Sequence, residues 1–212
     1  MAAFDVLHAF FKARVTITDD EFALMRSVMV PRSLASGAFL LRAGEIAQQA
    51  AFVANGCLRS YTVDSKGKEH IVQFAPETYW LADTTSLMTR APSQFFFEAI
   101  EDSDLLLLDG PGHERLVRDV RGYAESFRTG LQKHAAAKDR RIVSAMSASA
   151  EERYLEFLNT YPSIVTRVPQ WMLASYLGIS PETLSRIRKN LSRRKPRRAR
   201  GGQPSGNENQ SR

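Results

Sequence analysis

The chain has 212 residues, of which 43% are hydrophobic, so it can fold around one large or two modest cores. Its single cysteine, Cys57, excludes an intrachain disulfide framework, a Cys-ligated zinc finger and an iron–sulfur cluster, which all need several thiols. The formal net charge of +6 is uneven, because residues 186–212 hold ten Lys and Arg against one acidic residue. We interpret this end as the footprint of a polyanion; a solubilising tail is the alternative, and a membrane-surface helix is disfavoured because the segment has no apolar face.

No part of the sequence predicts a membrane-spanning or export segment. The apolar runs are shorter than the roughly 18 residues that a membrane span needs. The segment 1–15 contains Asp5 and lacks the basic start of a secretion signal. We therefore expect a cytoplasmic protein with no membrane partner.

The N-terminal half is expected to contain two short helices and then a series of strands. Helical spacing of apolar residues covers 4–14, and a capping pattern opens a second helix over 18–29. The Asn55-Gly56 pair predicts a type I′ hairpin, and residues 64–67 predict the next turn. Short β-rich runs between turn residues predict an all-β barrel or roll, and they cover 39–44, 51–63, 68–74, 94–101 and 104–109.

A long helix is expected at 120–145, where a stripe of residues recurs every three or four positions over some seven turns. The stripe consists of Val120, Ala124, Phe127, Leu131, Ala135, Lys138, Ile142 and Ala145. It either packs on the chain's own β-domain or pairs with a second copy across a two-fold axis. We favour the dimer because of the motif that follows, although Lys138 and the small residues weaken the seam. Ser149 then opens a helix that ends at Tyr161.

Residues 168–191 show the pattern of two short helices around a break. Gly178 can take the left-handed conformation that ends the first helix, Ser180 can cap the second, and Pro181 suits its first position. Each half has one apolar face, formed by Trp171, Ala174 and Leu177 and then by Leu184, Ile187 and Leu191. The pattern is typical of a helix-turn-helix.

An ordinary helical hairpin in a core would have the same spacing, and the position of the polar residues decides between the two. Six of the nine residues 192–200 are Lys or Arg. A helix in a major groove needs cations to meet phosphates, whereas a core hairpin does not. The outward face of the second helix holds Glu182, Thr183, Ser185, Arg186 and Lys189. We therefore predict a DNA-binding domain.

The order of parts, a β-roll, a long helix and a helix-turn-helix, resembles the bacterial Crp/Fnr transcription regulators from about residue 41 to 191. The resemblance is dense at NGCLRSYTVDSKGKEHIVQFAPETYWLAD, SAEERYLEFL and VPQWMLASYLGISPETLSRIRK. It implies an α+β fold with a cyclic-nucleotide-binding-like jelly roll and N-terminal helices at 1–119, a dimerisation helix at 120–147, and a helix-turn-helix domain at 148–195. A disordered basic tail is expected at 196–212. The family resemblance also implies a homodimer that binds double-stranded DNA, with RNA polymerase as a further partner.

The roll departs from the family pattern where cyclic nucleotides bind. Ala82-Asp83 stands in place of a Gly-Glu pair, and Pro92-Ser93 in place of Arg-Ser/Thr, with Arg90 two residues early. A buried cyclic phosphate without its arginine would be an unpaired charge, so we expect no cyclic nucleotide bound in the usual way and no cofactor. The alternative is another small effector in a non-standard pocket around Trp80, Asp83 and Arg90. The cysteine cluster of the family's oxygen sensors is also missing.

The resemblance also carries residue roles for the second helix, the predicted recognition helix 180–191. Glu182, Ser185 and Arg186 match the Glu-x-x-Ser-Arg that related regulators place on base edges, which their chemistry suits. We expect phosphate contacts from Gln170 and Thr183, whereas Ser180 and Lys189 are either DNA contacts or a plain cap and a solvated residue. The family implies an inverted repeat with TTGA-like half-sites. No alternating hairpin follows residue 191, so the basic tail is hypothesised to replace the contacts of a wing.

An enzyme and a nucleotide-gated module are the competing function classes. The sequence has no Gly-rich phosphate loop, nucleophile elbow or paired metal ligands, so we expect neither catalysis nor a metal site. The histidines His8, His70, His113 and His134 lie far apart without metal-binding spacing. Cys57 is expected to be a buried, inert thiol.

Overall fold

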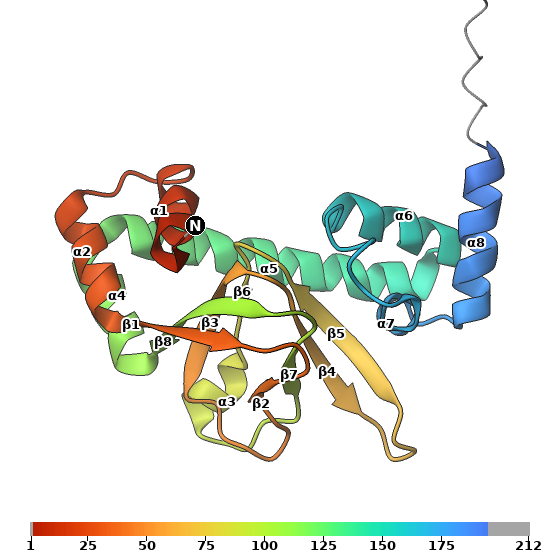
Figure 1. Cartoon of the computed structure of the whole chain (residues 1–212), viewed down its shortest axis with the longest axis horizontal. Coiled ribbons are helices and arrows are strands. Elements are labelled where there is room, and N and C mark those ends of the chain that lie inside the picture. Colours follow the sequence, from red (N-terminus) through yellow and green to blue (C-terminus); the bar gives the residue numbers. More distant parts are fainter. Residues whose placement is uncertain (1, 195–212) are drawn as a thin grey trace, which may run out of the picture.

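The computed structural model describes residues 2–194, so the basic tail expected at 196–212 lies outside the described residues. Helix α5 (Arg121–Ser147) runs along one side of the molecule with the strands beneath it (Figure 1). At one end lie α1 (Ala3–Lys12), α2 (Asp19–Val28) and α4 (Gly110–Asp119); at the other lie α6 (Ala150–Thr160), α7 (Gln170–Leu177) and α8 (Pro181–Arg194). None of the described helices is long and apolar enough to cross a bilayer.

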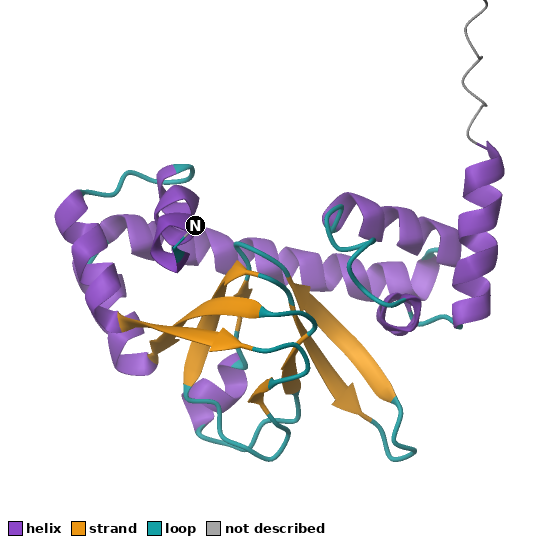
Figure 2. Cartoon of the chain, in the orientation of Figure 1, coloured by secondary structure: helices purple, strands orange, loops and turns teal. Residues whose placement is uncertain are grey.

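The strands form two four-stranded antiparallel sheets (Figure 2). One sheet has the order β1 (Met29–Leu34), β8 (Ser103–Asp109), β3 (Gln49–Asn55), β6 (Trp80–Leu81), and the other β2 (Phe39–Leu41), β7 (Phe96–Ala99), β4 (Leu58–Val63), β5 (Glu69–Ala75). Val53 and Leu105 of the first sheet and Leu58 and Phe97 of the second belong to one buried cluster. The predicted α+β fold with a β-roll is thereby confirmed.

The hairpin predicted at Asn55-Gly56 is wrong. Strand β3 pairs with β8 and β6, whereas β4 pairs with β5 and β7 in the other sheet. Only Gly56 of the two residues has a positive φ, at 87°. A Cβ on Gly56 would lie 2.3 Å from Ser103 Oγ, so the glycine is needed at a crowded corner where the chain changes sheets.

The turn predicted at 64–67 is confirmed as the connection between the paired strands β4 and β5. The Asp64 carboxylate accepts hydrogen bonds from the backbone N–H groups of Lys66 at 2.9 Å and Lys68 at 3.0 Å. Gly67 supplies the positive φ of 78° that such a turn needs. Strand β1 and the short helix α3 (Thr84–Thr89), by contrast, were not among the predicted elements.

The N-terminal helices cover the sheet that contains β8. Their apolar faces join side chains of β3, β8 and α4 in one cluster, which includes Leu7, Phe11, Met25, Phe52, Leu106 and Leu116. The capping box predicted at Thr18 is present, since the Thr18 hydroxyl accepts from the Glu21 N–H at 3.2 Å and the Glu21 carboxylate accepts from the Thr18 N–H at 2.8 Å. These two helices therefore pack on the roll.

The long helix α5 is buried only at its first turn. Tyr123 is buried, and Gly122 allows the loop before α2 to pass closely, because a Cβ there would lie 2.5 Å from the Thr16 carbonyl oxygen. Further along, Leu131 is 55% exposed and Ile142 60% exposed. The stripe thus packs on the chain itself as far as Phe127, whose ring centroid lies 4.5 Å from that of His113 in α4, and it is exposed from Leu131 onward.

The three C-terminal helices share a core. It contains Tyr154, Phe157, Leu173, Leu177, Leu184 and Ile187. Trp171, however, was predicted on the buried face of its helix and is 44% exposed. Ala174 and Leu177 of the predicted face are buried, and Met172 and Leu173 are buried with them, so the prediction is wrong only for Trp171. The Arg59 guanidinium lies 5.2 Å from the Trp171 ring centroid and gives the indole a partner.

Candidate nucleic-acid interface

The turn between α7 and α8 is built by backbone hydrogen bonds around Gly178. This residue has φ 66° and ψ 36°, the left-handed conformation. The Ile179 N–H donates to the Ala174 carbonyl at 3.0 Å and the Gly178 N–H donates to the Ser175 carbonyl at 3.1 Å. This pair of bonds is a Schellman motif, which satisfies the last carbonyls of α7 and turns the chain sharply.

Helix α8 begins at a side-chain cap. The Ser180 hydroxyl accepts from the Thr183 N–H at 3.2 Å, and Pro181 occupies the first helical position, where no N–H is needed. The pKa of Glu182 is below its usual range, mainly because the Ser180 side chain hydrogen-bonds to the carboxylate. The acidic side chain also lies in the first turn, where the helix dipole favours a negative charge.

The polar side chains that the sequence singled out share one side of α8. Glu182, Ser185, Arg186 and Lys189 are all exposed, and their spacing of three, four and seven positions places them on one helical face. Leu184 and Ile187 are buried against α6 and α7. Thr183 is half-buried, Ser180 and Gln170 are exposed, and Arg186 Nη2 donates to the Thr183 hydroxyl at 3.3 Å. Four of the predicted contact residues, Glu182, Ser185, Arg186 and Lys189, therefore share an exposed face of α8.

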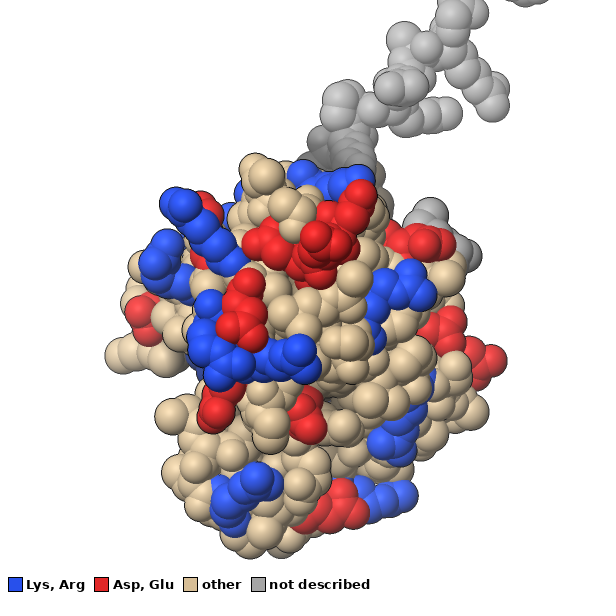
Figure 3. All heavy atoms as spheres, turned by 90° about the vertical axis from the view of Figure 1, so that its left-hand side faces the viewer, with Lys and Arg blue, Asp and Glu red and all other residues tan. Residues whose placement is uncertain are grey.

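The charge of α8 differs from that of the opposite end of the molecule. Among residues 181–193, one acidic residue accompanies four basic ones: Arg186, Arg188, Lys189 and Arg193. The face formed by the N-terminal helices mixes both signs (Figure 3), and there Arg118 pairs with Asp119 at 2.8 Å. A basic helix with one acidic residue near its start suits a surface that meets phosphates and base edges together.

The proposed effector residues of the roll lie around helix α3, where most of their polar groups bond within the chain. Asp83 is buried and caps α3 by accepting from the Ser86 N–H at 3.1 Å. Ser86 Oγ in turn donates to the Ala91 carbonyl at 2.6 Å and accepts from the Ala47 N–H at 2.9 Å. Arg90 donates to Gln48 Oε1 at 3.3 Å and ends α3 in the left-handed conformation, with φ 59°.

Residues 31–119 match the family model of the cyclic nucleotide-binding domain. The roll is a domain of that kind. The chain is also similar in structure to a mutant of CooA from Carboxydothermus hydrogenoformans, with a TM-score of 0.67 at 16% identity over 85% of this chain and 87% of that one. FixK2 from Bradyrhizobium japonicum gives 0.66 at 19% identity over 78% and 85%, and the c-di-GMP-responsive regulator CLP from Xanthomonas campestris gives 0.66 at 14% over 83% and 92%. No curated protein matches the sequence.

These likenesses show the fold of the chain, and most of its length takes part. A catabolite activator protein from Thermus thermophilus matches at a TM-score of 0.53 and 22% identity over 84% of each chain. The neighbours therefore share the fold of this chain over most of its length, and the family match is confined to residues 31–119.

An open cleft of about 570 Å³ lies away from α3, between the roll and the connection from α6 to α7. Ser36, Asn55, Gly56, Glu101, Asp102 and Arg167 line it. None of the residues predicted for an effector, Trp80, Asp83 and Arg90, belongs to that lining. Trp80 packs on Phe52, with ring centroids 5.4 Å apart. Asp83 and Arg90 thus lie at the two ends of α3. Neither they nor Trp80 lines the cleft.

The remaining titratable groups of interest have structural partners. Cys57 is buried, and burial raises the pKa of its thiol to about 12. His70 pairs with Asp64 at 2.8 Å, and His113 shares a 2.7 Å hydrogen bond with the Tyr123 hydroxyl while burial lowers its pKa. Within residues 2–194, no group of three or more His, Cys, Asp or Glu side chains is arranged to hold a metal.

Proposed function

We propose that this protein is a sequence-specific DNA-binding transcription regulator of the Crp/Fnr type. The observation that carries the proposal is the exposed face of α8, where Glu182, Ser185, Arg186 and Lys189 lie opposite the buried Leu184 and Ile187. Such a helix can enter a major groove with its first turns toward base edges. The proposal places it in the cytoplasm, with RNA polymerase as a partner and no catalytic activity.

Each side chain on this face has a role that its chemistry suits. Arg186 can donate two hydrogen bonds to guanine O6 and N7, Glu182 can accept from a cytosine amino group, and Ser185 can bond to either kind of base. Gln170 and Thr183 are the proposed phosphate contacts, and Ser180 and Lys189 either add to them or serve as a cap and a solvated residue. The chemistry of the face therefore combines direct base readout with backbone positioning.

The same proposal requires a homodimer. The exposed apolar side chains of α5, including Phe127, Leu131 and Ile142, form a surface that a second copy of the helix would cover. A two-fold axis along α5 would present two α8 helices to an inverted repeat. The members of the stripe from Leu131 onward are exposed in the single chain, which supports this arrangement.

We infer that the roll regulates DNA binding without holding a cyclic nucleotide in the usual way. The internal hydrogen bonds of Asp83, Ser86 and Arg90 would have to be exchanged before a phosphate could bind at α3. The second candidate is a regulator that responds to a cyclic nucleotide or another small effector through a non-standard pocket, which the family match of residues 31–119 favours.

Selection of duplexes from a randomised library by the purified protein tests the proposal. We expect an inverted repeat to be enriched, and its binding to weaken steeply with rising salt because phosphate contacts release counterions. Arg186→Ala should fail to enrich the same repeat, whereas Arg188→Ala on another side of α8 should enrich it. Enrichment of no sequence by the wild-type protein would contradict the proposal.

A further inference from the structure

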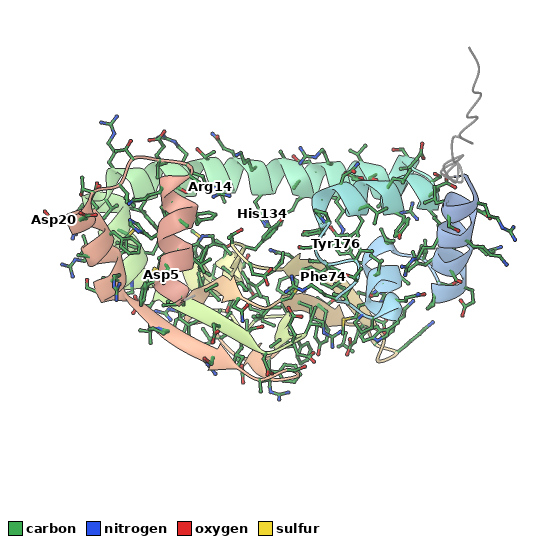
Figure 4. All side chains as sticks on the ribbon, turned by 45° about the horizontal axis from the view of Figure 1, so that its top comes forward. Asp5, Arg14, Asp20, Phe74, His134 and Tyr176 are labelled. Atoms are coloured by element: carbon green, nitrogen blue, oxygen red, sulfur yellow. The ribbon has the colours of Figure 1, made fainter. Side chains whose placement is uncertain are left out.

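The C-terminal helices are packed on the roll along a seam centred on β5. Phe74 of this strand lies 5.9 Å from Phe157 of α6 and 5.5 Å from Tyr176 of α7, measured between ring centroids. Phe74 and Tyr176 lie beneath α5 in Figure 4. Cys57, Ile71 and Phe74 of the roll belong to the same buried cluster as the core of α6, α7 and α8. The helices that carry the candidate interface thus share a core with the roll.

Strand β5 presents unpaired backbone groups to this seam, because it is an edge strand and contains a bulge. Its register with β4 pairs Gln73 with Ser60 and Ile71 with Tyr61, which leaves Val72 without a partner. A bulge residue leaves its peptide groups to be satisfied elsewhere. Ser175 of α7 meets part of this need, since its hydroxyl accepts from the Ile71 N–H at 3.1 Å and donates to the Glu69 carbonyl at 2.9 Å.

Arg141 of α5 supplies the other partners. One guanidinium nitrogen donates to the Val72 carbonyl, and the other donates to the Ile71 carbonyl at 3.0 Å and the Tyr176 carbonyl at 3.1 Å. The guanidinium also lies 4.0 Å from the Tyr176 ring centroid. The Tyr176 carbonyl is in the last turn of α7, where the helix dipole favours a cation. One side chain therefore connects the long helix, the bulge of the roll and the helix that precedes α8.

We propose that Arg141 is the positioning residue that fixes the direction of α8 relative to α5 and the roll. This inference rests on the proposed function, since two recognition helices in a dimer must keep the separation of their half-sites. Apolar contacts such as those of Phe74 are non-directional and allow sliding, whereas the planar fork of an arginine on three carbonyls fixes orientation. Holding the helices in place before DNA arrives reduces the ordering that binding must otherwise impose.

A second arginine supports the seam from its other side. Arg167, in the connection between α6 and α7, contacts Glu77 at 2.7 Å and also Glu101, both on the roll. These carboxylates are about one-third exposed, with 36% and 34% of their side-chain surface accessible. Solvent therefore screens this bridge, and it does not reach α5. Among the side-chain hydrogen bonds of residues 2–194, those of Arg141 connect α5 to both the roll and α7.

The first test measures the arrangement within one chain, independently of DNA and of dimerisation. Spin labels are placed at Arg32→Cys on β1 and Asn190→Cys on α8, both exposed positions, in a Cys57→Ala background mixed with excess unlabelled protein. We expect one narrow distance distribution, which Arg141→Ala broadens. Arg140→Ala is the matched control, because this exposed neighbour carries the same charge and its side chain makes no hydrogen bond or ion pair with residues 2–194. An unchanged width for Arg141→Ala would overturn the proposal.

The second test uses the duplex that the wild-type protein selects and a version whose half-sites are one base pair further apart. We expect the wild-type protein to prefer the selected spacing by about tenfold, equivalent to about 1.4 kcal/mol, and Arg141→Ala to lose most of this preference. A general folding defect would weaken binding to both duplexes alike. Arg141→Lys, which keeps the charge but not the fork, should be intermediate and covers the case in which the alanine variant does not fold.

The outcomes separate the two proposals. If the wild-type protein selects no duplex, the proposed function fails, and the spin-label distances alone decide whether Arg141 positions α8. If Arg141→Ala keeps the spacing preference, or binds the selected duplex more tightly than the wild-type protein, the positioning role is overturned.

Discussion

Helices α3 and α8 both begin at a polar cap, yet they use the polar residues that follow in opposite ways. At α3, Asp83 and Ser86 are buried and hydrogen-bonded within the chain. At α8, Ser185 and Lys189 are exposed, and within residues 2–194 the Arg186 guanidinium bonds only to Thr183 of its own helix. A ligand at α3 must replace existing hydrogen bonds, whereas a ligand at α8 replaces water. The comparison shows that residue type alone does not mark a binding site.

The largest effect is expected from substitutions of the exposed apolar side chains of α5, the proposed dimer interface. Phe127→Glu combined with Leu131→Glu should abolish the dimer, because both carboxylates would be buried in the seam at a cost of several kcal/mol. Sedimentation at micromolar concentration checks this. Replacing Glu125, an exposed acidic residue of the same helix, with Gln is the control and should leave the dimer intact. A double variant that remains dimeric would exclude this helix as the interface.

The exposed face of α8 is tested by a single substitution. Arg186→Ala should lose about 1–3 kcal/mol of binding free energy on the selected duplex and little on a scrambled one, because only the former presents the guanine edge. Competition binding of both duplexes measures the difference. An equal loss of binding free energy on both duplexes would show that Arg186 contacts only phosphate. The exposed face of α8 would then not read sequence through this residue.

The internal role of Asp83 predicts a smaller effect of a different kind. Asp83→Ala removes the cap of α3 and should lower the free energy of unfolding by about 1 kcal/mol, while binding to the selected duplex stays the same. Chemical denaturation measures this, with Thr84→Ala as an exposed neighbour that should change little. A loss of DNA binding without a loss of stability would instead indicate that Asp83 has a role in regulation.

The last prediction is that cyclic nucleotides have no effect on the thermal stability of the protein. Millimolar cyclic AMP or cyclic GMP should not raise the melting temperature, because a ligand stabilises the folded state, by RT ln(1 + [L]/Kd), only if it binds that state. Calorimetry under the same conditions should show no saturable heat. A saturable signal with a matching rise in melting temperature would favour the second candidate function, in which α3 exchanges its internal hydrogen bonds for a nucleotide.

Local chemistry made α7 and α8 predictable. Gly178 and Ser180 act through bonds to residues within five positions, so their roles as a helix end and a cap could be read from spacing. The repeated β-rich runs likewise predicted the roll. These features depend on neighbours along the chain, which a sequence displays directly.

The errors arose where distant segments meet. Gly56 is needed because Ser103 lies so close that a Cβ would clash with it. Trp171 is partly exposed, whereas its neighbours Met172 and Leu173 belong to the buried cluster that contains Phe74. The role of Arg141 depends on the bulge at Val72, some 70 positions away, which no local pattern reveals. Asp83 was recognised as a departure from the family, but its use as a buried cap could not be predicted without the register of α3 against residue 47.

The reactivity of Cys57 reports whether the contact between the C-terminal helices and the roll is closed. The thiol is 1% exposed and lies in the cluster that joins β5 to α6 and α7. Because burial raises its pKa to about 12, the reactive thiolate is scarce at neutral pH as long as the cluster is closed. Alkylation must then wait for an opening that brings this sulfur into water. The rate at which the sole cysteine of the folded chain is alkylated therefore records how often the C-terminal helices part from the roll.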